Sequence, residues 1–111
     1  MTDDELTDVW ESGHLGRAVT HGEHVRIAWV IITRHGKAAG TRRIADSTLR
    51  NCIAMEAADR FDPELTALWS EAIASATASS NAATATEFLE EHPELLNSRL
   101  LGLPAWMITP S

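Results

Sequence analysis

Repeated helix-start signals constrain the fold of this chain more than any other feature of its sequence. Residues 20–23 (THGE) form a Thr-x-x-Glu capping box directly before the most apolar segment, and residues 84–87 (TATE) repeat the pattern. Residues 62–64 (DPE) combine an N-cap aspartate, a proline at the first helical position and an acid in the first turn. These signals predict a chain that is built from helices.

We therefore expect an all-α fold, a single-domain bundle of five to six helices that covers residues 1–111. Residues 30–33 (VIIT) are β-prone in isolation, but they continue an apolar helical pattern, so no strand is expected. Residues 103–111 form a non-helical apolar tail, which either folds back over the bundle or contacts a partner chain. The helices are expected at residues 3–12, 21–35, 41–58, 62–76, 84–92 and 94–101.

Helical periodicity also predicts which side of each helix is buried. In the third expected helix the apolar face consists of Ala45, Leu49, Cys52 and Ile53. In the fourth it consists of Leu65, Leu68, Trp69, Ala72 and Ala76.

Composition excludes several classes of function. The formal net charge of -7 and the pI near 5.1 make the surface acidic, which disfavours binding to nucleic acid phosphates. No apolar run is long enough to cross a membrane, and the acidic residues 1–5 lack the layout of a signal peptide. The single cysteine, Cys52, forms no internal disulfide. Together these features favour a reducing cytoplasm.

Two histidines open the most apolar segment. His21 and His24 lie three residues apart, so on a helix they point to the same side as Val25 and Ala28. We expect both imidazoles to face the interior, where they could share one metal ion or one substrate. The alternative is structural: His21 then contacts a neighbouring loop from the first turn, and His24 is a partly buried core residue.

Two carboxylates could complete such a site. Asp62 lies at the edge of the apolar face of its helix, and Glu56 projects into the stripe of the preceding helix. The alternatives are that Asp62 only caps its helix and that Glu56 reaches water near a helix end.

Two histidines and a carboxylate are the ligand set of Fe(II) facial-triad sites and of catalytic zinc sites. The expected metal ligands are therefore His21, His24 and Asp62, with Glu56 as a fourth, and the ion would be Fe, Mn or Zn. Without metal, a histidine would act as general base and Asp62 would orient it. The spacing His-x-x-His is weak evidence by itself, since it lacks further partners.

Three blocks of the chain resemble a family of small, largely uncharacterised bacterial helical proteins. Residues 19–29 (VTHGEHVRIAW) are similar to the family's aromatic-x-His-x-x-His-Leu-x-x-Ala-Trp block, and residues 60–69 (RFDPELTALW) to its Lys-Tyr-His-Glu-Thr-Leu-Thr-x-x-Trp block. Residues 88–96 (FLEEHPELL) are similar to its Phe-Leu-x-x-x-Pro-x-Leu-Leu block. The family's His-Glu pair is Asp62-Pro63 here, so a nitrogen ligand would be missing if relatives bind metal there.

Two functions are compatible with these observations. The first is a small bacterial enzyme, of the kind found in specialised metabolism, that uses His21, His24 and Asp62 on a small-molecule substrate. The second is a non-catalytic protein that binds a partner protein, or forms a homodimer, through its C-terminal tail with Trp106 and Met107. Neither function involves nucleic acid or a membrane.

Overall fold

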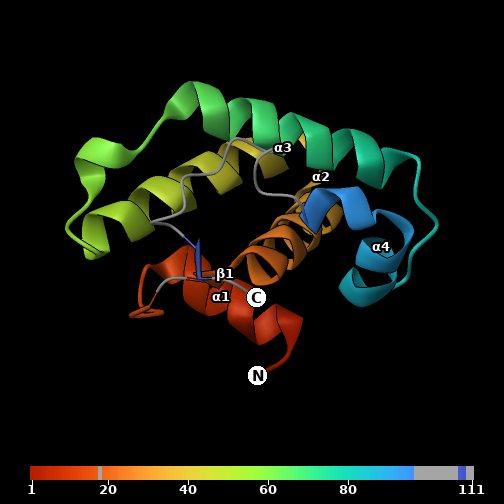
Figure 1. Ribbon diagram of the computed structural model, residues 1–111, viewed down its shortest axis with the longest axis horizontal. Coiled ribbons are helices and arrows are strands. Elements are labelled where there is room, and N and C mark those ends of the chain that lie inside the picture. The colour runs from red at the N-terminus through yellow and green to blue at the C-terminus, as the bar shows by residue number, and fades with distance from the viewer. Residues whose placement is uncertain (18, 97–107, 110–111) are drawn as a thin grey trace.

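The fold is all-α, as expected, and one long helix organises it (Figure 1). The computed structural model describes residues 1–17 and 19–96 and the backbone of Ile108–Thr109; the side chains of residues 21, 60 and 96 lie outside this description. The described elements are α1 (Asp3–Ser12), β1 (Val19–Thr20), α2 (His21–Ala54), the 3₁₀ helix η1 (Ala58–Arg60), α3 (Pro63–Ala78), α4 (Ala85–Glu91), the 3₁₀ helix η2 (Pro93–Leu96) and β2 (Ile108–Thr109).

The described residues contain four α-helices, fewer than the five to six expected. One reason is that the helices expected at 21–35 and 41–58 form a single bent element, α2. A second is that the residues after His92 form the 3₁₀ turn η2 instead of the start of an α-helix. Residues 97–101 of the sixth expected helix lie outside the described part of the chain.

The predicted helix starts are confirmed by their hydrogen bonds. The hydroxyl of Thr20 accepts from the Glu23 backbone N–H at 3.1 Å, and the Glu23 carboxylate accepts from the Thr20 backbone N–H at 2.9 Å. The Thr84 hydroxyl accepts from the Glu87 N–H at 3.1 Å. These bonds satisfy backbone donors that a helix leaves without partners at its first turn.

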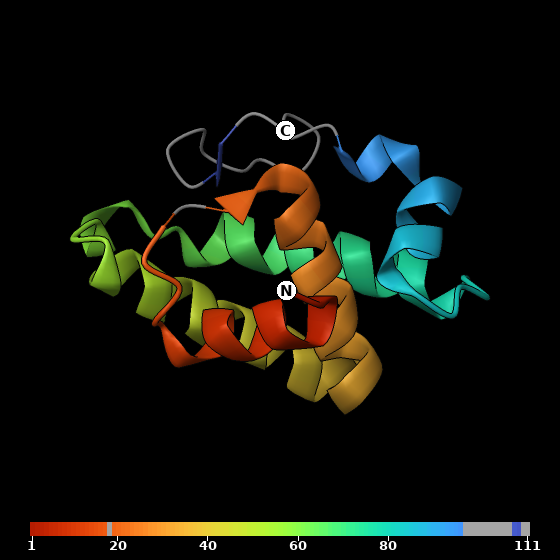
Figure 2. The same cartoon turned by 90° about the horizontal axis from the view of Figure 1, so that it is seen from below.

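A sharp bend divides α2 at Gly36. Gly36 has φ 83° and ψ 173°, a backbone conformation that is essentially restricted to glycine. The second limb begins before Thr41, because the Thr41 hydroxyl donates back to the Lys37 carbonyl at 2.8 Å and so lies inside the helix. Figure 2 shows the two limbs, orange and olive, running in different directions. The first limb thus ends close to the boundary expected at residue 35, and the second limb begins before the start expected at residue 41.

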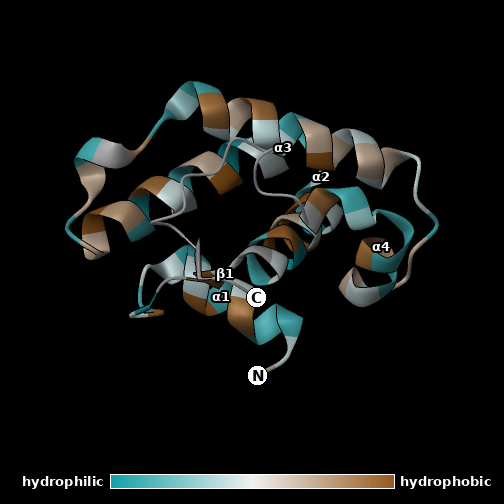
Figure 3. Cartoon of the chain, viewed as in Figure 1, coloured by the Kyte–Doolittle hydropathy of each residue, from teal (hydrophilic) through white to brown (hydrophobic). Residues whose placement is uncertain are grey.

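The core surrounds α2, which packs against α1, α3 and α4. Ile27, Ile31 and Val25 from its first limb are buried together with Ile73 of α3 and Phe88 of α4. Figure 3 shows apolar residues, in brown, along α2 and α3. None of the helices in the described part is long and apolar enough to cross a bilayer.

Two short strands, which were not expected from the sequence, join residues 108–109 to the segment directly before α2. Val19 of β1 pairs with Ile108 of β2, and Thr20 pairs with Thr109, in parallel register. Strands of two residues carry no periodicity that a sequence pattern could reveal. At Ile108–Thr109 the expected tail thus folds back on its own chain; the rest of 103–111 lies outside the described residues.

The Glu23 carboxylate gives the stability of the fold a defined pH dependence. It accepts two hydrogen bonds from Arg17, at 2.9 and 2.8 Å, and these bonds, followed by its capping bond to Thr20, lower the pKa of Glu23 to about 2. Because this pKa is lower in the folded than in the unfolded protein, ionised Glu23 stabilises the fold at pH values above the unfolded pKa of 4.5. This stabilisation is lost as the pH falls towards 2. We expect Glu23→Gln to lower the free energy of unfolding by about 1–2 kcal/mol at neutral pH.

Urea titrations of both proteins at several pH values measure this effect. The difference in the free energy of unfolding between wild type and Glu23→Gln is expected to decrease as the pH falls from 4.5, the unfolded pKa of Glu23, to about 2, its folded pKa. Glu71→Gln is the matched control, because Glu71 forms only an exposed ion pair with Lys37. A difference that stays constant down to the acid end of the range would contradict this account.

Candidate functional site

His24 lies at the junction of three helices and is almost completely buried. Its side chain, on the first turn of α2, is 1% exposed. The imidazole lies between two indole rings: its centroid is 4.1 Å from that of Trp69 on α3 and 5.1 Å from that of Trp10 on α1. The inward orientation expected for His24 is therefore observed, and its nearest aromatic neighbours are tryptophans.

Small polar side chains hold one of these tryptophans in place. The Trp10 indole N–H donates to the Ser47 hydroxyl at 3.2 Å, and the Asn51 side-chain amide donates to the Trp10 carbonyl at 2.7 Å. The same amide donates to the Ser47 carbonyl at 2.8 Å. Ser47 and Asn51 are both buried on the second limb of α2, so they fix α1 against that limb through hydrogen bonds as well as packing.

Two polar atoms near this centre are buried without a hydrogen-bond partner among the described residues. They are the Thr48 hydroxyl oxygen and the Trp69 indole nitrogen. A buried polar atom of this kind costs free energy. The helices around His24 thus carry more polar chemistry than an ordinary apolar core.

The buried face of the second limb of α2 differs from the prediction. Leu49 and Ile53 were expected inside, but both are exposed, and Ile53 is 58% exposed. The buried face instead contains Ile44, Ser47, Thr48, Asn51 and Cys52. Ser47 and Asn51 are drawn inside because they pair with polar groups of Trp10, an interaction that local hydropathy does not contain.

The face predicted for α3 was also partly wrong. Trp69 is buried as expected, but Leu65 and Leu68 are exposed, Leu68 to 68%. Thr66, Ser70, Ile73 and Ala74 are buried in their place. The hydroxyls of Thr66 and Ser70 donate to backbone carbonyls one turn earlier, at 2.8 and 2.7 Å, so these small polar residues can be buried at little cost.

The other proposed site residues occupy different positions. Asp62 is exposed, and one of its carboxylate oxygens accepts from the backbone N–H groups of Glu64 and Leu65, both at 3.0 Å. It therefore acts as the N-cap of α3. His21 is the first residue of α2, and its side chain lies outside the described residues.

Glu56 is an exposed residue that ends α2. It has φ 58°, the left-handed conformation that commonly terminates a helix. Its N–H donates to the Ile53 carbonyl at 3.0 Å, and the next N–H, of Ala57, donates to the Cys52 carbonyl at 2.8 Å. Glu56 thus occupies a helix-terminating turn in which glycine is the usual residue.

The described residues contain no group of three or more His, Cys, Asp or Glu side chains that could hold a metal ion. The metal set of His21, His24, Asp62 and Glu56 therefore remains a prediction, and it depends on the side chain of His21. The sequence did not predict that Trp10 contacts His24 or that Ser47 and Asn51 hold Trp10. The available signal was the spacing of Ser47, Thr48 and Asn51, which places three polar residues on one face of a helix.

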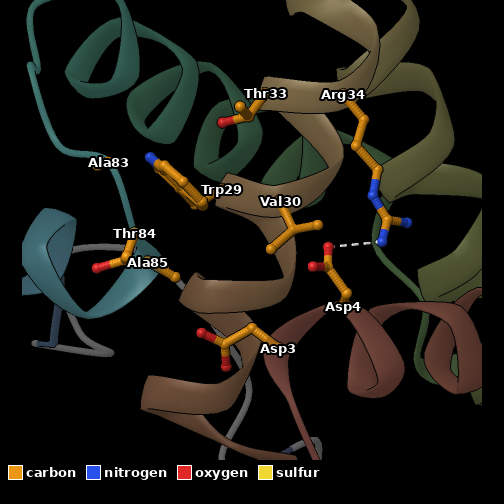
Figure 4. A pocket seen from close by; sticks show the side chains of 9 residues that line it. All are labelled: Asp3, Asp4, Trp29, Val30, Thr33, Arg34, Ala83, Thr84 and Ala85. Atoms are coloured by element: carbon orange, nitrogen blue, oxygen red, sulfur yellow. Dashed lines mark hydrogen bonds and ion pairs between the residues drawn. The ribbon is translucent and has the colours of Figure 1, made fainter.

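A second feature is a surface pocket of about 310 Å³ beside the first limb of α2. Its walls come from the start of α1, the middle of α2 and the segment that leads into α4 (Figure 4). It is lined by Asp3, Asp4, Trp29, Val30, Thr33, Arg34, Ala83, Thr84 and Ala85. The sequence analysis did not predict it, because its three walls are far apart along the chain.

Comparison with known proteins returned no match: no family model, no curated protein and no solved structure is significantly similar to this chain.

Proposed function

We propose that this protein is a small enzyme that acts on a small molecule and uses His24 as its acid–base residue. The observation that carries the proposal is the burial of the His24 imidazole between the rings of Trp10 and Trp69. An imidazole is the side chain best suited to exchange a proton near neutral pH. Its burial costs free energy, and such costs are typical of groups that a protein uses.

The two indole rings suit this role. The face of an indole attracts a cation, so Trp10 and Trp69 would stabilise the protonated imidazole even though water is excluded. Exclusion of water opposes that effect, because it favours the neutral form. A general acid–base residue must reach both protonation states, and in this proposal the two opposing effects leave His24 able to exchange a proton.

The metal-dependent form of this proposal adds His21, with Asp62 and Glu56 as carboxylate ligands of Fe, Mn or Zn. The position of His21 on the same turn of α2 as His24 supports it. The cap that Asp62 provides uses one carboxylate oxygen, which leaves the other for a ligand or a histidine. We also propose that the chain is related to the small bacterial helical proteins that its three blocks resemble, with a role in specialised metabolism.

Two measurements on untagged protein test the proposal. Elemental analysis for Fe, Mn and Zn tests the metal-dependent form, and NMR titration of the His24 imidazole tests the metal-free form. We expect either stoichiometric metal or a change of protonation of His24 between about pH 5 and 9. His24→Phe keeps an aromatic ring between the tryptophans and identifies the His24 signals; His35→Phe, at an exposed position of α2, is the control. A metal-free protein whose His24 holds one protonation state throughout would overturn both forms.

A second candidate function, a helical dimerisation protein, is favoured by the exposed apolar side chains of α2 and α3. Leu49 and Ile53 line a shallow pocket of about 280 Å³ together with Asp46 and Arg50. This face carries one acid and one base a helical turn apart. Two copies packed antiparallel about a two-fold axis would therefore place Asp46 of each copy near Arg50 of the other.

Sedimentation equilibrium tests this second candidate. We expect a concentration-dependent dimer for the wild type and a monomer for Ile53→Glu, which places a charge in the apolar face. Glu64→Gln, at an exposed position that the proposed contact does not use, is expected to leave the dimer intact. A wild-type protein that is monomeric at about 0.1 mM would exclude dimerisation as its function.

A further inference from the structure

We propose that the pocket in Figure 4 is a binding site for small organic cations, such as an amine with an aromatic or aliphatic body. The site is separate from the His24 centre, because none of its nine lining residues belongs to that centre. Its volume, about 310 Å³, lies at the lower end of the range for ligand pockets, which suits a ligand with one ring or a short chain.

The apolar part of the pocket is preformed. Trp29 of α2 packs against Phe88 of α4, with ring centroids 6.3 Å apart, which restrains the indole. Val30 and Ala85 are buried beside it. Ala83 and Ala85 have small side chains, and Figure 4 shows them across the open space from the indole. A flat apolar body therefore has a rigid aromatic surface to rest on.

The charges around the pocket favour a cation over an anion. The guanidinium of Arg34 donates to Asp4 at 2.7 Å and to Asp8 at 2.8 Å, so both of its terminal nitrogens are engaged. Asp3 is paired only through a longer contact of 3.5 Å with Arg26. The three carboxylates (Asp3, Asp4 and Asp8) and two guanidinium groups (Arg26 and Arg34) together carry a net charge of one negative unit, on a protein whose net charge is -7.

The groups that remain for a ligand are therefore acceptors and an aromatic face. Figure 4 shows the Asp3 carboxylate and the Thr33 hydroxyl directed to the same side as the Trp29 indole, from below and above it. Asp3 is only 31% exposed, which reduces the screening of its charge by water. In the proposed site an ammonium group paired with Asp3 would also lie against the face of Trp29, the arrangement of a cation–π site.

Three probes of equal size test the charge preference: phenethylammonium, phenylacetate and 2-phenylethanol. Binding is followed through the Trp29 indole N–H signal in ¹H–¹⁵N NMR spectra, which Trp29→Phe identifies. We expect phenethylammonium to produce a saturable shift with a Kd of about 1 mM, and the alcohol and the anion to bind more weakly. Equal or tighter binding of phenylacetate, or no saturable shift with the cation, would overturn the proposal.

Variants test which residues are responsible. Asp3→Asn is expected to weaken phenethylammonium binding about fivefold, because it removes the partly shielded carboxylate. Trp29→Leu keeps an apolar side chain without the aromatic face, and its binding is followed through the backbone N–H signals of Ala83 and Ala85, which also line the pocket. It is expected to weaken phenethylammonium binding about threefold. Asp59→Asn removes the same charge at an exposed position of η1, outside this pocket, and is expected to change nothing. Identical affinities of Asp3→Asn and Asp59→Asn would contradict the assignment of Asp3, and the outcome for His24 is independent of both.

Discussion

Replacement of Trp69 with alanine is expected to lower the free energy of unfolding by about 3–5 kcal/mol. Trp69 is 1% exposed, and its ring packs against the imidazole of His24 where α3 meets α2. Removal of the indole leaves a large cavity that the surrounding helices cannot fill without moving. Urea unfolding followed by circular dichroism measures the loss without relying on tryptophan fluorescence.

Leu68→Ala is the matched control for this prediction. It removes a large apolar side chain from the neighbouring position of the same helix, but Leu68 is exposed. We expect its effect to stay within about 0.5 kcal/mol. If Trp69→Ala costs no more than Leu68→Ala, then Trp69 does not hold α3 against α2.

The second large effect is expected at the bend of α2. Gly40 of the second limb lies close to Ile32 of the first: a Cβ atom at this position would be 2.9 Å from the Ile32 Cα and 3.2 Å from the Ile32 Cγ1. The backbone of Ile32 cannot yield as a flexible side chain would. Gly40→Val is therefore expected to lower the free energy of unfolding by about 2–3 kcal/mol.

Helix propensity alone predicts that replacing Gly40 raises the free energy of unfolding, since a glycine inside a helix costs about 1 kcal/mol relative to alanine. Chemical denaturation of Gly40→Ala and Gly40→Val therefore separates the two effects. Ala39→Val, at the exposed adjacent position, is the control for the β-branched side chain. A stabilised Gly40→Ala protein would show that the limbs can separate without cost.

The local boundaries of the fold could be predicted because they depend on a few neighbouring residues. Thr20 and Glu23 cap α2 within one turn, and Asp62 and Pro63 do the same for α3. Gly36 interrupts α2 for an equally local reason, its positive φ. These local signals did not predict how the two limbs of α2 pack against each other after the bend. The close contact between Ile32 and Gly40 exists only after the limbs have folded together.

The candidate site was predicted only in part. The burial of His24 followed from its position beside Val25 and Ala28 on one face of a helix. Its two aromatic neighbours did not, because Trp10 and Trp69 are brought to it by α1 and α3 from distant parts of the chain. The pocket beside Trp29 escaped prediction for the same reason, as three separate segments line it.

The sequence by itself determined where helices begin, that the class is all-α, and that His24 faces inward, since each depends on contacts within one or two turns. The tertiary structure decided which side of α3 and of the second limb of α2 is buried. There Ser47 and Asn51 are inside and Ile53 and Leu68 outside, against their hydropathy. On the second limb of α2 the physical reason is that Ser47 and Asn51 form hydrogen bonds with the indole N–H and the carbonyl of Trp10 across helices, which offset the cost of burying them. On α3 the buried hydroxyls of Thr66 and Ser70 find acceptors within their own helix.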